Sequence, residues 1–240
     1  MTDPATAPGF RPAAGLAGAL YLVIIVAGVW SEAAVRAPLL APDDPASVFA
    51  GLQTSLGMVR ASIAADTVML IADVALAVLL FRLLRTHGPA LALAAMAFRL
   101  MQAAVLGANL LNLQAAVLLA EDGRAAVMLG DGAAALATLR LQAHAHGYDL
   151  GLAFFGVNAV LTGVLLLRSR WAPRALGLLV TAAGGVYLAG SGVRLLAPGL
   201  SATFGPAYAL PLLAESAFCL WLLWVSLRRG APPARVLPSR

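Results

Sequence analysis

Charge and cysteine are scarce in this chain. Charged residues make up 11% of its 240 residues, lysine is absent, and Cys219 is the single cysteine, so no intramolecular disulfide is possible. Hydrophobic residues reach 61%. A soluble domain carries about 25% charged residues, so the composition excludes an ordinary soluble protein and indicates an integral membrane protein. The absence of lysine beside abundant alanine, glycine and arginine is typical of a GC-rich bacterial genome.

Six stretches are apolar enough to cross a bilayer, which takes about 20 residues each. They cover about residues 13–33, 56–83, 89–119, 141–167, 175–196 and 208–227. The predicted fold class is all-α, a polytopic bundle of six transmembrane helices that forms a single domain over residues 1–240. The proline-containing tails, 1–12 and 228–240, are expected to be disordered. The first outer loop is expected to hold a short helix capped by Asp44 or Ser47.

Arginine positions predict the orientation. Ten arginines fall on one side of the six spans and three, Arg36, Arg124 and Arg140, on the other. Positive charge in short loops stays inside, so both termini are predicted to be cytoplasmic and the protein to lie in a bacterial cytoplasmic membrane. The first apolar run is too long for a signal peptide and is expected to remain as an uncleaved helix. The arginines form no groove with interleaved aromatics, so we expect lipid headgroups and no nucleic acid as partners.

Ionisable and amide side chains inside these spans are the candidate site. A charge at the bilayer centre costs about 2.5–3.5 kcal/mol, so such residues pair with one another or line a wet cavity. The candidate ligand-binding residues are Arg60, Asp66, Asp73, Arg99, Gln102, Asn109, His146, Asp149, Arg194 and Glu215.

Two polar stripes run along the second and third spans. Asp66 and Asp73 are seven residues apart and share a helix face, as do Gln102 and Asn109. We expect Arg99 to pair with Asp66 or Asp73. Such a pair is explained equally well by helix registration or by a binding role.

The fourth span begins with a His-x-His pattern that does not predict a metal site. His144 and His146 are about 200° apart on an α-helix, so the pattern does not present both rings to one metal ion unless the helix starts later in the chain. His146 shares a face with Asp149. No motif predicts a metal or any other cofactor.

The polar residues of several spans are expected to enclose a cavity in the outer half of the bundle. Asp66, Arg99, Gln102, Asn109, His146 and Glu215 would bound it, with a floor near Leu106 and Cys219. Arg60 or Arg194 would stand at its mouth, although both arginines could instead snorkel to the headgroups. Glycines in the fourth and fifth spans, among them Gly156, Gly184 and Gly185, predict close helix packing.

Several segments together resemble a known family. "AFRLMQA", "LNL", "LAFFG" and a last span with a buried glutamate are similar to the uncharacterised membrane family catalogued as domain of unknown function 4386, over about residues 12–228. The resemblance implies a bacterial six-helix membrane protein without an established activity. Its recurring polar positions correspond here to Arg60, Asp66, Asp73, Arg99, Gln102, Asn109, His146, Arg168 and Glu215.

Three functions fit this sequence. The first is binding or transport of a small polar molecule or of protons by the charged core. The second is a non-catalytic membrane subunit or sensor whose polar residues only specify packing. The third is an intramembrane enzyme acting on a lipid-like substrate with His146 or Glu215 as acid or base, which no nucleophile, zinc or phosphate-binding motif supports.

Overall fold

The computed structural model describes residues 9–42, 44–121, 123–130 and 132–228. Six helical segments in this part of the chain are long and apolar enough to cross a membrane. They are Phe10–Leu39, Leu56–His87, Pro89–Glu121, Gly132–Arg168, Arg174–Leu196 and Pro198–Leu227. No strand occurs in the described ranges, so the all-α, six-span fold is confirmed. The expected disorder of the tails concerns mainly residues 1–8 and 229–240, which lie outside these ranges, and Phe10 already begins a helix.

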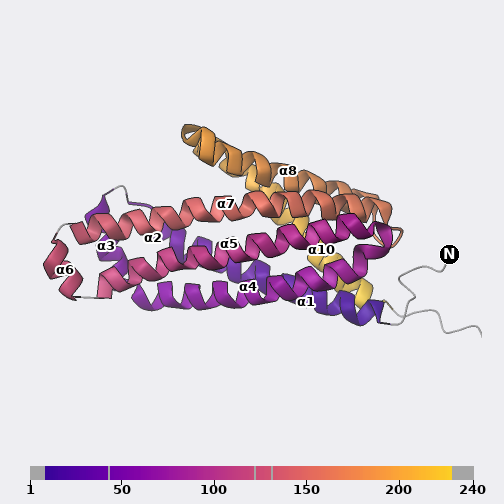
Figure 1. Ribbon diagram of the computed structural model, residues 1–240, viewed down its shortest axis with the longest axis horizontal. Coiled ribbons are helices and arrows are strands. Elements are labelled where there is room, and N and C mark those ends of the chain that lie inside the picture. The colour runs from indigo at the N-terminus through magenta and orange to yellow at the C-terminus, as the bar shows by residue number, and fades with distance from the viewer. Residues whose placement is uncertain (1–8, 43, 122, 131, 229–240) are drawn as a thin grey trace, which may run out of the picture.

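The spanning helices lie side by side along the long axis of the molecule (Figure 1). Their main elements are α1 (Phe10–Trp30), α4 (Leu56–Leu84), α5 (Pro89–Glu121), α7 (Gly132–Arg168), α8 (Arg174–Leu196) and α10 (Ala209–Leu227). Each packs against the next in chain order, and α10 returns to pack against α1, so the six helices close a ring.

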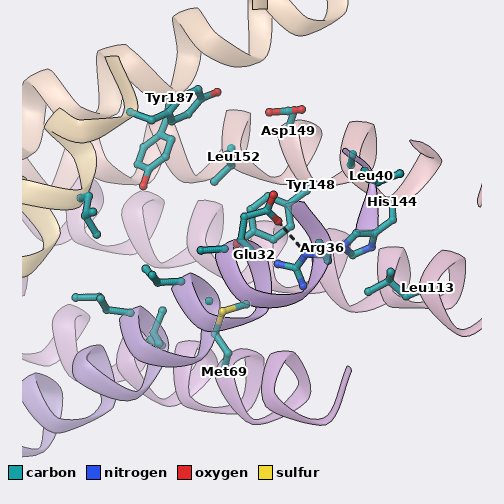
Figure 2. Close-up of a pocket in the computed structure, with 18 of the residues that line it drawn as sticks. Glu32, Arg36, Leu40, Met69, Leu113, His144, Tyr148, Asp149, Leu152 and Tyr187 are labelled. Carbon is teal, nitrogen blue, oxygen red and sulfur yellow. Dashed lines mark hydrogen bonds and ion pairs between the residues drawn. The ribbon is translucent and has the colours of Figure 1, made fainter. Parts of the chain in front are cut away.

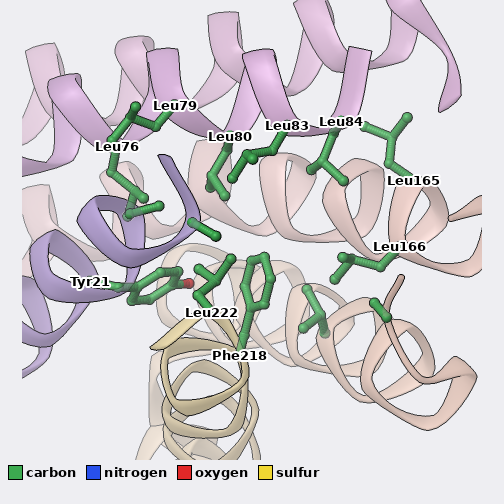
Figure 3. Packing of buried hydrophobic residues seen from close by; sticks show 14 of the residues in the cluster. Tyr21, Leu76, Leu79, Leu80, Leu83, Leu84, Leu165, Leu166, Phe218 and Leu222 are labelled. Carbon is green, nitrogen blue, oxygen red and sulfur yellow. The ribbon is translucent and has the colours of Figure 1, made fainter. Parts of the chain in front are cut away.

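One end of the ring, here called the arginine-rich end, carries the start of α1 and the end of α10, with Arg82, Arg85, Arg168 and Arg174. A large apolar cluster fills this half of the ring (Figure 3). Tyr21, Leu76, Leu166, Phe218 and Leu222 are among its buried members. The described residues of this half are therefore packed mainly through apolar side chains.

The opposite end, here called the far end, extends into shorter helices. They are α2 (Ala37–Leu39), α3 (Pro45–Thr54), α6 (Gly123–Leu129) and α9 (Ser201–Phe204), with 3₁₀ turns at Pro198–Leu200 and Gly205–Tyr208. The 3₁₀ turn at Arg85–His87 joins α4 to α5 at the arginine-rich end. A second apolar cluster, which includes Val48, Leu52 and Leu113, fixes α3 to the ends of α5 and α7.

The predicted cap of the short helix α3 is confirmed. The Asp44 carboxylate accepts hydrogen bonds from the backbone N–H and the hydroxyl of Ser47. These bonds hold the pKa of the exposed Asp44 carboxyl below its usual range.

Glycines bring α7 and α8 into close contact. A Cβ added at Gly184 would lie 2.7 Å from the carbonyl oxygen of Gly156, and one added at Gly163 would lie 2.8 Å from that of Gly177. Backbones approach this closely only where side chains are absent. Gly185 behaves differently, because a Cβ there would meet nothing within 4 Å. The expectation of close packing therefore holds for one face of α8.

Candidate ligand-binding site

A pocket of about 450 Å³ lies in the far half of the ring, between α1, α7, α8 and α10 (Figure 2). Small-molecule sites usually measure about 300–1,000 Å³. Much of the wall is aliphatic and comes from Ile24, Ile25, Val29, Met69, Leu152 and Leu212. Polar groups converge on it from four of the six spanning segments, so it combines an apolar body with charged positions.

The first spanning segment reaches the pocket through a change of helix type. After Trp30 the α-helix widens into a π-helical segment, η2 (Ser31–Arg36), and then continues to Leu39. In a π-helix the backbone hydrogen bonds join residues five apart in the sequence, whereas in an α-helix they join residues four apart. π-Helical turns often occur at functional sites. The segment η2 places Glu32 and Arg36 on the pocket wall, and Arg36 lies beyond the end at residue 33 that the apolar run predicts.

Arg36 is buried and already holds two carboxylates. Its Nε donates to Glu32 Oε2 at 2.9 Å, and its Nη1 lies 2.5 Å from Asp66 Oδ2. The guanidinium also lies over the Tyr148 ring, 5.6 Å from the centroid. The positive charge of Arg36 is therefore neutralised inside the protein.

His144, which is not among the site residues predicted from the sequence, borders the pocket. Its Nδ1 lies 3.2 Å from the carbonyl oxygen of Asn109, which can only accept, so Nδ1 carries the proton. Nε2 of the neutral ring is then an acceptor, and it has no hydrogen-bond partner among the described residues. The Asn109 side chain donates in return to the backbone carbonyl of His144 at 2.8 Å, so one bond holds the ring and the other holds the backbone beside it.

A second ion pair forms another part of the pocket wall. Arg194 Nε donates to Asp149 Oδ2 at 2.6 Å, and both residues line the pocket. The Ser191 hydroxyl donates to the Asp149 carbonyl at 2.7 Å and so ties α8 to α7. The charge of Arg194, like that of Arg36, is met by a carboxylate.

Glu215 differs from the other acids of the wall because no ion pair to it occurs in the described part of the chain. The hydroxyl of Tyr187 donates a hydrogen bond to Glu215 Oε1. Tyr208 lies beside Tyr187, with ring centroids 6.1 Å apart. Gly190 makes this arrangement possible, since a Cβ there would lie 2.2 Å from the Tyr208 hydroxyl oxygen.

A third ion pair lies deeper, at the middle of the ring. Arg99 Nη2 is 2.5 Å from Asp73 Oδ1, both side chains are buried, and the expected pairing of Arg99 with a span-two aspartate is confirmed for Asp73. Arg99 also lies over the rings of Tyr21 and Phe155. Asn158 contacts it at 3.4 Å.

The sequence-predicted residues divide into three groups. Asp149, Arg194 and Glu215 line the pocket. Asp66, Asp73, Arg99, Gln102 and Asn109 are buried in the surrounding helices without lining it. Arg60 and His146 lie outside it.

The expected boundary of the cavity therefore needs correction at several positions. Arg60 pairs with Glu121 and its side chain is half exposed, so Arg194 and not Arg60 borders the pocket. His146 is exposed and its Nδ1 bonds back to the Gln142 carbonyl at 2.9 Å. Leu106 and Cys219 are buried elsewhere and form no floor. Helix rotation, which spacing alone does not fix, accounts for the exchange of His146 for His144.

The polar groups do not gather into a metal-binding set. No cluster of three or more His, Cys, Asp or Glu side chains able to hold a metal ion occurs within the described ranges. The carboxylates of the wall are separated by aliphatic and tyrosine side chains, which suit an organic ligand better than a hydrated ion.

The fold and the site together define a multi-pass integral membrane protein with six spans and with internal ion pairs around Arg36, Arg99 and Arg194. One pocket-wall carboxylate, Glu215, has no ion-pair partner among the described residues. The family model described as "Domain of unknown function (DUF4386)" matches residues 16–226, and the chain belongs to this family. No curated protein and no solved structure matches the chain.

Proposed function

We propose that this protein binds a small organic molecule in the far half of its helix ring, in the plasma membrane of a bacterium. The observation that carries the proposal is the pocket of about 450 Å³, which is lined by aliphatic side chains and by Glu215, His144 and Tyr187. A purely structural polar core needs only pairwise contacts, as in Arg99 with Asp73. Groups with spare hydrogen-bonding capacity beside an open volume need water or a ligand.

Binding is favoured over transport because of what lies beneath the pocket. Transport requires a path to the other side of the membrane, and the apolar cluster of Figure 3 fills the arginine-rich half. If the arginine-rich end is cytoplasmic, as the arginine distribution predicts, the pocket lies in the outer leaflet half. An amphiphilic molecule can reach it there from the lipid or from outside the cell.

The proposal is tested with phenylbutanol, a neutral probe with an aromatic body and one hydroxyl. Ligand-observed NMR on the protein in phosphatidylcholine nanodiscs, with empty nanodiscs as the background, measures its affinity. Leu152→Trp fills the pocket, whereas Leu178→Trp adds the same ring to an exposed position on α8, whose leucine is 60% exposed.

We expect the Leu152→Trp variant to lose at least about tenfold in affinity, and the Leu178→Trp variant to bind as the wild type does, because a filled pocket excludes the probe. Equal binding to wild type and to Leu152→Trp would show that the probe only enters lipid. That result would leave the non-catalytic subunit as the better interpretation.

A further inference from the structure

The pocket wall carries an excess of negative charge. Two arginines, Arg36 and Arg194, line it together with three acids, Glu32, Asp149 and Glu215. Each arginine is already in an ion pair, and Arg36 holds Asp66 behind the wall as well. A ligand with an anionic head would therefore find no free cation here and would have to break one of these pairs.

Glu215 is the pocket-lining acid that has no ion pair among the described residues. Its single side-chain partner in the described residues is the Tyr187 hydroxyl, which supplies one hydrogen bond but no charge. Arg99 and Glu215 both line a small crevice next to the pocket, but the ion pair of Arg99 is with Asp73. Because Arg99 is paired with Asp73, it does not neutralise the formal charge of Glu215, which lines the pocket.

Two buried atoms of pocket-lining residues have no hydrogen-bond partner in the described part of the chain. One is Nη2 of Arg36, a donor on a guanidinium whose charge two carboxylates already neutralise, and the other is an acceptor. Nε2 of His144 has a lone pair and no partner among the described residues. An occupant that satisfies Glu215 and His144 must bring hydrogen-bond donors, and a positively charged donor gains most beside a carboxylate.

Aromatic rings stand next to Glu215. Tyr187 and Tyr208 both line the pocket, with centroids 6.1 Å apart. Ring faces attract cations within about 6 Å of the centroid, and such rings beside an acid are a common way to bind an organic ammonium group. The aliphatic wall of Ile24, Val29 and Leu212 offers space for the rest of such a molecule.

We infer that the ligand is an organic cation, an amine in its ammonium form with an apolar body, whose nitrogen pairs with the Glu215 carboxylate beside Tyr187 and Tyr208. This inference rests on the proposed function and names its ligand class. It requires no bond to form or break in the ligand.

Three probes that share one apolar body test the inference. Phenylbutylammonium, phenylbutanol and phenylbutyrate each have a phenyl ring and a four-carbon chain, counting the carboxyl carbon, and their head groups are cationic, neutral and anionic. Their affinities are compared by the same NMR titration in nanodiscs of zwitterionic phosphatidylcholine, which gives the lipid itself no net preference for the ammonium. We expect phenylbutylammonium to bind wild type at least about tenfold more tightly than phenylbutanol, because only the ammonium forms a charge-assisted hydrogen bond with the Glu215 carboxylate. Phenylbutyrate should bind most weakly, because its own carboxylate is repelled by Glu215.

Glu215→Gln keeps the shape of the side chain and removes its charge, so it should abolish the advantage of the ammonium over the alcohol. Glu121→Gln makes the same chemical change at the ion pair with Arg60, away from the pocket, and should leave the advantage intact. If Glu215→Gln does not fold, the order of the three probes on wild type decides alone.

The inference is overturned if phenylbutanol or phenylbutyrate binds wild type as well as phenylbutylammonium does, if no probe binds, or if Glu215→Gln retains the preference. Phenylbutanol binding that Leu152→Trp removes would still support the proposed function when the ammonium has no advantage. A failure of the inference about the ligand class can therefore be distinguished from a failure of the proposed binding function.

Discussion

The Nη2 atom of Arg99 lies 2.5 Å from Oδ1 of Asp73 at the middle of the helix ring, and both side chains are buried. Removing one member of a buried ion pair leaves an uncompensated charge and typically costs about 3–5 kcal/mol, whereas removing both costs less. The pair therefore links α4 to α5 through two buried side chains.

We predict that Arg99→Leu lowers the melting temperature of the purified protein strongly, and that Arg99→Leu/Asp73→Leu recovers part of the loss. Arg99→Leu/Asp66→Leu should recover none, because Asp66 pairs with Arg36. Thermal unfolding in detergent measures all three variants. Rescue through Asp66 and not through Asp73 would contradict the pairing.

The packing of α7 on α8 gives a prediction with a control one residue away. Gly184→Ala places a methyl group 2.7 Å from the Gly156 carbonyl oxygen, and overpacking of this kind costs about 1–3 kcal/mol. Gly185→Ala meets nothing within 4 Å and should stabilise the helix slightly, by up to about 1 kcal/mol. Equal melting temperatures for the two variants would show that α8 packs with another face.

The two neighbouring histidines should behave differently. His144→Ala removes a buried ring bonded to the Asn109 carbonyl, and leaving a buried acceptor unsatisfied costs about 1–3 kcal/mol. His146→Ala removes an exposed ring and should stay within about 0.5 kcal/mol of wild type. Denaturation of the two variants under identical conditions compares them, and a larger loss for His146→Ala would reverse the assignment.

The sequence alone predicted the helices well because each is set by a local signal. Apolar runs of sufficient length, separated by Pro198, Gly88 and similar turn residues, define six spans without tertiary information. The Asp44 cap is local as well, since donor and acceptor are three residues apart.

The site was harder to predict because its geometry depends on how each helix is rotated and where it ends. Spacing showed that His144 and His146 face different ways but not which of them faces inward. The π-helical segment η2 carries the first span past residue 33 and brings Arg36 to Asp66, which a regular helix pattern does not suggest. Tyr148 and Tyr208 carry no charge, so a search for ionisable residues inside apolar runs passed over them.

The orientation of the bundle is a further prediction. In a Cys219→Ala background, Ala50→Cys on α3 should react with a membrane-impermeant maleimide on intact cells, since the loops with few arginines lie outside. Thr86→Cys, at the arginine-rich end, should react only after the cells are opened. The reverse pattern would place the termini outside.

The most direct test of ligand binding at Glu215 is a crystal structure of the protein with bromophenylbutylammonium, whose bromine is located by anomalous scattering. We expect a bromine peak inside the pocket between α1 and α7, among Ile24, Val29 and Leu152, with the ammonium nitrogen at the Glu215 carboxylate. A well-diffracting crystal with bromine only on the lipid-facing surface, and none in the pocket, would contradict it.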